Sequence, residues 1–187
     1  GAAALNIPSL GLSNFTWHTA YEGLIEERLL SFLHAQYNQM TYHFPLACSN
    51  EPSWGIEENQ SFGFYSREID DHEAQRIRKE IDPVGENHII YFGLGMKVDI
   101  GTLSELPIWQ SPNCKFIVSS NVDVTHPNVY KIPQEETETQ HYVAAADLVL
   151  TKAGWGTISE AVCAGVPLLI TNRSSMKEDR HTIDYLV

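Results

Sequence analysis

The sequence predicts an α/β fold, a doubly wound parallel sheet that follows the remnant of a preceding α/β domain. From about residue 88 onward, short apolar runs alternate with polar or helical stretches. The runs are continuous rather than alternating in polarity, which is typical of strands that are covered on both faces. Strands that alternate with helices pair in parallel. A chain of 187 residues, 43% of them hydrophobic, can bury such a core.

Five strands and two helices are expected in this second part of the chain. The first helix covers residues 73–81, and Asp70 is placed to cap its N-terminus. The second helix covers residues 157–164 and ends at Gly165, because glycine favours the left-handed conformation common at helix C-termini. The expected strands are the β-rich runs at residues 88–92, 114–119, 128–132, 147–151 and 167–171.

The first third of the chain has a different pattern. The expected elements are, in order, a strand at residues 7–12, a long helix at 19–39, a short strand at 44–48 and a linker at 49–66. One helix and two short strands cannot bury a sheet. We therefore interpret residues 1–66 as the C-terminal remnant of an N-terminal domain plus a linker. Residues 67–187 are interpreted as a C-terminal domain that is itself truncated at its end.

The balance of charge excludes one class of partner. The chain has 12 Lys and Arg against 24 Asp and Glu, so its formal net charge is −12. Proteins that bind nucleic acids gather basic residues on one face instead. We expect no nucleic-acid partner, and any anionic ligand must be held by local groups that act against the overall field.

The sequence further predicts a cytoplasmic protein without a transmembrane segment, a metal site or a cofactor. The longest nearly apolar run, residues 161–170, is too short to cross a bilayer, and the start of the chain lacks the pattern of a signal peptide. Cys48, Cys114 and Cys163 are far apart and do not have the spacing of zinc ligands. We expect them to be reduced, buried thiols.

The most informative stretch, residues 144–161, is a strand, a glycine-containing turn and the start of a helix. Gly154 and Gly156 let the backbone approach a ligand, and the free amides of a first helical turn favour phosphate oxygens. Lys152 adds a cation before the turn. A structural interpretation stays open, since Thr157 and Glu160 fit a capping box and Lys152 fits a solvated strand end.

Several residues of this region occur in the order of a known family pattern. The segment resembles the nucleotide-sugar-binding half of GT-B glycosyltransferases, in particular the MurG-like enzymes of the glycosyltransferase family 28 C-terminal type, over about residues 85–187. The start of the chain, residues 7–17, resembles the end of the N-terminal domain in a bacterial subgroup of this superfamily. The pattern A-A-D-L-V, G-x-G-T, E-A and G-x-P is carried here by Asp147, Gly154, Gly156, Thr157, Glu160, Ala161, Gly165 and Pro167.

The resemblance implies two facing Rossmann-like domains, of which the first binds the acceptor and the second holds most of the nucleotide sugar. It implies that Glu160 binds the ribose hydroxyls and that the amides of residues 154–157 face the diphosphate. Gly93 and Gly95, after the first strand of this half, would bring the backbone near the donor, and Ile132 would lie near the base. The full set of implied donor residues is Gly93, Gly95, Ile132, Lys152, Gly154, Trp155, Gly156, Thr157, Glu160, Arg173, Glu178 and His181.

The turn after the fifth strand differs from the MurG-like pattern. MurG-like enzymes usually have D-x-Q or H-Q there, whereas this chain has Arg173, Glu178 and His181, closer to the bacterial subgroup. By the resemblance this turn contacts the sugar or the diphosphate. A solvated histidine at a helix start is the alternative for His181.

The implied reaction transfers a sugar, most simply from a UDP-sugar, to the hydroxyl of an unknown acceptor. A general base would come from the N-terminal domain, where His18 is the candidate; its alternative is a packed aromatic cluster with Trp17 and Tyr21. We expect this chain by itself to bind a nucleotide without completing a transfer. Contact with a membrane surface is expected only through the missing domain. A non-catalytic nucleotide-sugar-binding module and a GT-B-fold UDP-sugar epimerase are the alternative functions.

Overall fold

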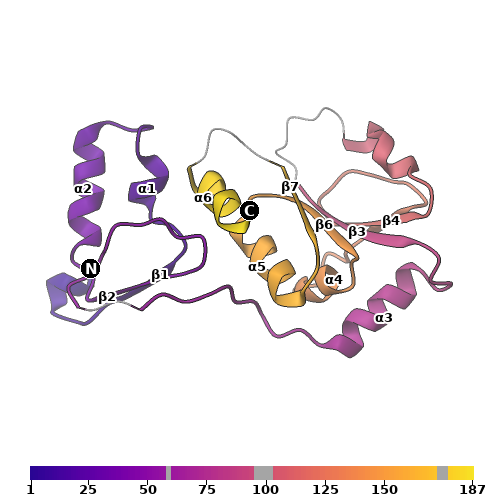
Figure 1. Ribbon diagram of the computed structural model, residues 1–187, viewed down its shortest axis with the longest axis horizontal. Coiled ribbons are helices and arrows are strands. Elements are labelled where there is room, and N and C mark those ends of the chain that lie inside the picture. The colour runs from indigo at the N-terminus through magenta and orange to yellow at the C-terminus, as the bar shows by residue number, and fades with distance from the viewer. Residues whose placement is uncertain (58–59, 95–102, 172–176) are drawn as a thin grey trace. The chain divides into compact units, whose positions relative to one another are not determined.

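The computed structural model describes residues 1–57, 60–94, 103–171 and 177–187, and the side chain of residue 178 is also outside the description. The chain divides into two compact units (Figure 1). One unit comprises Gly1–Phe64 with Asn172–Val187, and the other comprises Tyr65–Thr171.

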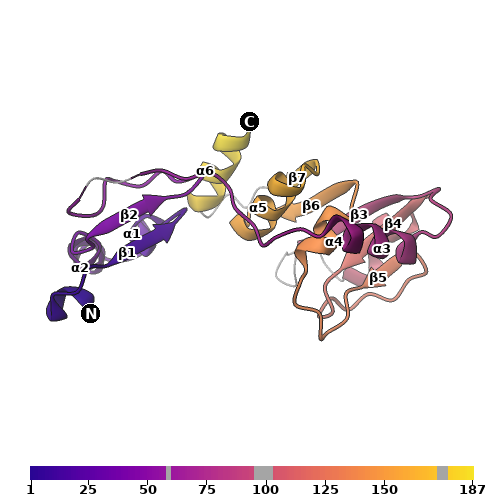
Figure 2. The same cartoon turned by 90° about the horizontal axis from the view of Figure 1, so that it is seen from below.

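The second unit contains a sheet of five parallel strands in the order β5-β4-β3-β6-β7 (Figures 1 and 2). The chain moves outward from β3 first in one direction and then in the other, which is the doubly wound arrangement expected from the sequence. All five expected strands are present, and every predicted end lies within one residue of the observed end. Their bounds are β3 (His88–Gly93), β4 (Cys114–Val118), β5 (Val129–Lys131), β6 (Leu148–Lys152) and β7 (Leu168–Thr171).

Both faces of this sheet are covered. Ile89 and Tyr91 of β3 belong to one hydrophobic core, and their neighbour Phe92 belongs to a second core with Trp109 and Phe116. Alternate residues of a strand therefore serve opposite cores, which explains why the strand sequences are continuously apolar. Helices α3 (Asp71–Ile81), α4 (Gln140–Ala144) and α5 (Trp155–Ala164) contribute to the first core, and the short helices η2 (Leu103–Glu105) and η3 (Pro107–Gln110) to the second.

The expected helix ends are confirmed in two places and wrong in a third. The carboxylate of Asp70 accepts hydrogen bonds from the amides of His72 (2.8 Å) and Glu73 (3.4 Å) at the start of α3. Gly165 ends α5 with a φ of 69°. However, α5 begins at Trp155 with Gly154 as its N-cap, so the helix starts two residues before the predicted Thr157.

Asp147, the acidic residue of the A-A-D motif, connects α3 to the sheet. Its carboxylate accepts a hydrogen bond from the amide of Ile89 (2.8 Å) and forms an ion pair with Arg78 (2.8 Å). Arg78 also donates to the carbonyl of Ala145 (3.0 Å). The main chains pair in the other direction, since the amide of Asp147 donates to the carbonyl of Ile89 (2.7 Å). This motif residue therefore has a structural role in the fold.

The first unit contains a two-stranded parallel sheet and helices. Gly23, with a φ of 80°, separates α1 from α2, so the single helix predicted for residues 19–39 is wrong. The left-handed conformation at Gly23 cannot continue an α-helix. The elements of this unit are η1 (Ala2–Leu5), β1 (Leu10–Ser13), α1 (Trp17–Tyr21), α2 (Glu27–Tyr37), β2 (Tyr42–Pro45) and α6 (Lys177–Leu186).

The interior of the first unit is organised around Trp54, whose side chain is fully buried. The carboxylate of Glu51 accepts hydrogen bonds from the indole of Trp54 (2.7 Å), from both the amide (2.7 Å) and the hydroxyl (2.8 Å) of Thr16, and from the hydroxyl of Thr19 (2.9 Å). Thr16 is also the N-cap of α1. One carboxylate thus joins the start of α1 to the segment after β2.

Helix α6 packs against α1 and belongs to the first unit, whereas the sequence placed residues 177–187 in the second domain. The division into a remnant and a C-terminal domain stays a prediction. All three cysteines are free thiols, but only Cys48 is buried; Cys163 is exposed, contrary to expectation. Within the described residues, no helix has the length and apolar character needed to cross a bilayer.

We predict that two substitutions at Asp147 differ in their effect on the free energy of unfolding. Asp147→Asn keeps an acceptor for the Ile89 amide and loses only a half-exposed ion pair, which costs less than about 1 kcal/mol. Asp147→Ala leaves the buried amide of Ile89 without this acceptor and costs about 1–3 kcal/mol. Urea unfolding measures both, with Glu73→Gln on the surface of α3 as the control that changes little. Equal losses for Asn and Ala would contradict the bridging role.

Candidate functional site

The turn between β6 and α5 presents a helix N-terminus without a side-chain cap. Gly154 is the N-cap, and within the described parts of the chain the amides of Gly156 and Thr157 have no hydrogen-bond acceptor. Gly156 is exposed, and apart from its chain neighbours and the backbone of its own helix, no described atom lies within 4 Å of the position that a Cβ would take there. The turn therefore has the features of an anion-binding site: unsatisfied amides, the positive end of a helix dipole, and space beside them.

Two further predicted residues lie next to this turn. Lys152 ends β6, and its Cε is 3.7 Å from the position that a Cβ on Gly154 would take. The aliphatic part of the Lys152 side chain therefore runs beside the turn. Gly93 ends the neighbouring strand β3 and pairs with Thr151; a Cβ on Gly93 would lie 3.2 Å from the hydroxyl of Thr151. A larger residue at this position would crowd Thr151, so packing by itself explains the glycine.

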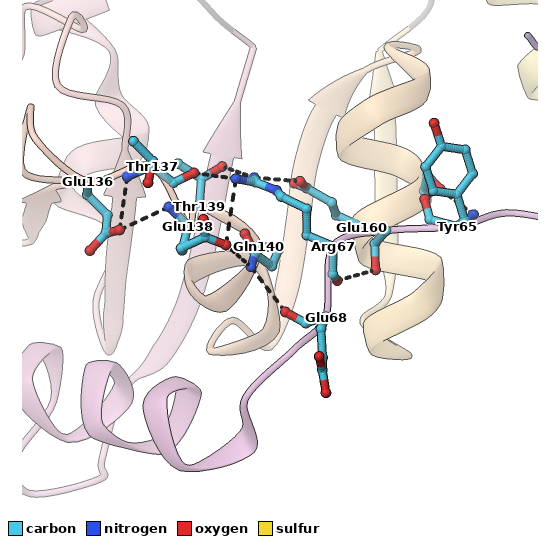
Figure 3. A network of polar contacts seen from close by, with 11 residues as sticks. Tyr65, Arg67, Glu68, Glu136, Thr137, Glu138, Thr139, Gln140 and Glu160 are labelled. Atoms are coloured by element: carbon cyan, nitrogen blue, oxygen red, sulfur yellow. Dashed lines mark hydrogen bonds and ion pairs between the residues drawn. The ribbon is translucent and has the colours of Figure 1, made fainter.

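Glu160 does not form the capping box that the sequence allowed. Thr157 is not the N-cap, so the reciprocal arrangement is absent. The carboxylate of Glu160 instead forms an ion pair with Arg67 at 3.0 Å (Figure 3), and its side chain is 18% exposed. No sequence pattern predicts this role for Arg67, a single basic residue in a polar stretch before α3. Trp155, at the first position of α5, lies with its ring 5.4 Å from that of Tyr65.

The phenol of Tyr91 lies close to this ion pair. Burial and, to a lesser extent, the charge of Glu160 raise its pKa to about 12, against an opposing effect of the charge of Arg67. Tyr91 is therefore a neutral hydrogen-bonding group throughout the physiological pH range. The Glu160 carboxylate and the Arg67 guanidinium are the charges beside it.

The acidic residues at the start of α3 form contacts within the helix itself. Asp70 caps the helix, and Glu73 binds Arg76 with an ion pair of 2.7 Å. No group of three or more His, Cys, Asp or Glu residues that could hold a metal ion occurs in the described ranges.

The remaining predicted donor residues are not gathered at the turn by the described structure. The side chain of Ile132 is buried in the hydrophobic core, and its amide donates to the carbonyl of Val118 at 2.9 Å. The structure therefore places the side chain of Ile132 in the core, and the proximity of this residue to a nucleotide base stays a prediction. Gly95 and Arg173 lie outside the described residues, as does the side chain of Glu178.

His18 and His181 lie together in the first unit. They line a cavity of about 420 Å³ together with Glu22 and Lys177, which form an ion pair at 2.8 Å. The Nε2 atom of His181 is 3.2 Å from the side-chain Nδ2 atom of Asn50. His18 packs against the rings of His34 and Trp54 rather than in the cluster expected with Trp17 and Tyr21, which stack on each other.

Comparison with known proteins identifies the region of the turn. Residues 119–182 match the model of the glycosyltransferase family 28 C-terminal domain. This match contains β6, the glycine turn, α5 and Glu160. A search of curated proteins gave no match.

Solved structures of glycosyltransferases share the fold. The glycotransferase of kitacinnamycin has 15% sequence identity and a TM-score of 0.56, over 99% of this chain and 57% of its own. SnogD from Streptomyces nogalater has 16% identity and a TM-score of 0.56, over 99% of this chain and 54% of its own. UGT2 of Phytolacca americana, complexed with UDP-2fluoro-glucose and pterostilbene, has 13% identity and a TM-score of 0.51, over 83% of this chain and 39% of its own.

The chain thus spans little more than half the length of the first two of these structures. Identities this low establish the fold alone, and the family match adds the C-terminal domain. Both agree with the resemblance seen in the sequence. Residues 119–182 therefore match the glycosyltransferase family 28 C-terminal domain, and the chain shares its Rossmann-like fold with solved glycosyltransferases.

Proposed function

We propose that this chain supplies the donor-binding part of a glycosyltransferase that transfers a sugar from a UDP-sugar to an acceptor hydroxyl. One observation carries the proposal: the uncapped N-terminus of α5 lies inside the segment that matches the glycosyltransferase domain. The match supplies the family, and the open turn supplies a place for the diphosphate. The acceptor stays unidentified.

In this proposal the diphosphate faces the amides of Gly156 and Thr157, with the ammonium group of Lys152 as a further positive charge. The helix N-terminus carries roughly half a unit of positive charge. These local charges oppose the net charge of −12 on the chain. The same groups would stabilise the charge that develops on the departing diphosphate during transfer.

The proposed role of Glu160 is to accept hydrogen bonds from the ribose hydroxyls. A carboxylate is an acceptor with two oxygens and suits a pair of neighbouring hydroxyls. The choice of uridine is supported by the UDP-2fluoro-glucose complex of UGT2, whose fold resembles this chain. Arg173, Glu178 and His181 remain proposed contacts of the sugar or diphosphate, and His18 remains the proposed base.

We predict that a uridine nucleotide stabilises the chain against heat. A ligand that binds only the native state at 100 times its Kd adds about 2.7 kcal/mol of stability. For a chain of this size each 1 kcal/mol raises Tm by roughly 2–4 °C. A thermal-shift screen of UDP, GDP, ADP, dTDP and their sugars, with UMP as the control that lacks the second phosphate, measures this. Unchanged Tm values with all of them would refute the proposed function.

A transfer assay separates the enzyme from a binding module. UDP-dependent stabilisation together with sugar transfer by the chain supports a complete catalytic unit. Stabilisation without transfer supports the donor-binding part on its own, with the base supplied elsewhere. We expect the second result for this chain.

We predict that Gly156→Ala separates stability from nucleotide binding. Alanine in place of glycine within a helix stabilises it by about 1 kcal/mol, and the new methyl group meets no atom of the protein. The same methyl group would occupy the space of the diphosphate and weaken UDP binding about tenfold, which corresponds to 1.4 kcal/mol. Urea unfolding and isothermal titration calorimetry measure the two effects.

The matched control is Gly63→Ala, since a Cβ at Gly63 also meets no atom within 4 Å and lies in the other unit. It should leave UDP binding unchanged. Full UDP affinity in the Gly156→Ala variant would place the diphosphate away from the start of α5.

A further inference from the structure

Arg67 is the centre of a polar network beside the candidate donor site (Figure 3). Its Nη2 atom donates to the carboxylate of Glu160 (3.0 Å) and to the hydroxyl of Thr139 (2.9 Å). Its Nη1 atom donates to the carbonyl of Thr137 and lies 4.0 Å from the carboxylate of Glu138. The guanidinium thus spans the distance between the segment before α4 and the middle of α5.

The backbone on the N-terminal side of Arg67 is fixed to α5. The amide of Tyr65 donates to the hydroxyl of Ser159 (3.0 Å), which in turn donates to the carbonyl of Tyr65. Ser159 is only 1% exposed. The ring of Tyr65 packs against Trp155. Two residues before Arg67 the chain is therefore held against the helix that carries Glu160.

The backbone on the C-terminal side is fixed to α4. The carbonyl of Glu68 accepts a hydrogen bond from the side-chain amide of Gln140 (3.1 Å), which also donates to Glu138 (2.6 Å). Gln140 is 1% exposed. Because the backbone is held on both sides of Arg67, the position of its Cα atom is fixed. The planar guanidinium then loses little further conformational freedom when it forms its hydrogen bonds.

This network acts on one oxygen of Glu160. Arg67 binds Oε1, and Oε2 has no hydrogen-bond partner within the described ranges. An unheld glutamate on a helix surface samples several rotamers. Here the charge and geometry of Arg67 select one of them and leave the second oxygen available as an acceptor.

We propose that Arg67 is a positioning residue for the donor nucleotide, which holds the carboxylate of Glu160 in the orientation that receives a ribose hydroxyl. The inference rests on the proposed function, because it gives Glu160 the ribose as its ligand. Arg67 itself touches the carboxylate and not the nucleotide. Its effect should therefore appear only with ligands that carry ribose hydroxyls.

The test compares UDP with 2′,3′-dideoxy-UDP, which lacks both hydroxyls, by isothermal titration calorimetry on the full chain. In the unmodified chain UDP should bind about tenfold or more tightly than the dideoxy nucleotide, the value of a hydrogen bond to a charged acceptor. In Arg67→Met this ratio of dissociation constants should fall below about 3, while binding of the dideoxy nucleotide stays within a factor of two. Arg67→Gln, which keeps a polar group without the charge, serves if the methionine variant does not fold.

Glu160→Gln should lower the ratio in the same way, and the double variant should lower it no further, since two residues that act through one hydrogen bond are not additive. Arg76→Met is the matched control, because it removes an arginine from exposed ion pairs on α3, and its ratio should equal that of the unmodified chain. A full ratio in Arg67→Met and Arg67→Gln would show that Arg67 only fastens the segment and would overturn the inference. If UDP does not bind the unmodified chain, the proposed function is refuted, and the inference that rests on it is refuted as well.

Discussion

Parallel pairing of five strands is the constraint on which the candidate site depends. In such a sheet every strand ends at the same edge, so the turns that follow the strands lie side by side. The register that pairs Gly93 of β3 with Thr151 of β6 places the ends of these two strands together. The chain leaves β3 and β6 toward opposite sides of the sheet, and such a reversal is the place where doubly wound folds bind ligands.

The family motif combines residues of two kinds, and the structure separates them. Asp147 binds the amide of Ile89 and the side chain of Arg78, and Gly165 ends α5 in the left-handed conformation. These contacts are needed by the fold whether or not a nucleotide binds. Among the residues that the structure describes, Gly156 and Thr157 have no comparable structural partner, which is why they are the best candidates for ligand contacts. A motif match alone assigns all of these residues to one function.

Glu160 is a motif residue whose side chain is oriented by a segment outside the sheet. The motif places Glu160 on α5, but the orientation of its carboxylate depends on Arg67, which lies before α3. The same two charges affect the pKa of Tyr91 in opposite directions. The side chain of Arg67 is 43% exposed, and ion pairs that solvent reaches contribute little to stability, so the proposed value of this pair lies in the geometry that it imposes.

The sequence by itself determined the α/β class, the five strands, the cap at Asp70 and the position of the glycine turn. Each of these depends on local patterns: apolar runs, a helix-capping side chain, and glycines between a strand and a helix. Only the tertiary structure decided that α5 starts at Trp155, that Gly23 divides the first long helix, that Ile132 is in the core, and that Arg67 binds Glu160. Arg67 and Glu160 are far apart in the sequence, and no local pattern encodes a contact that exists only once the chain has folded.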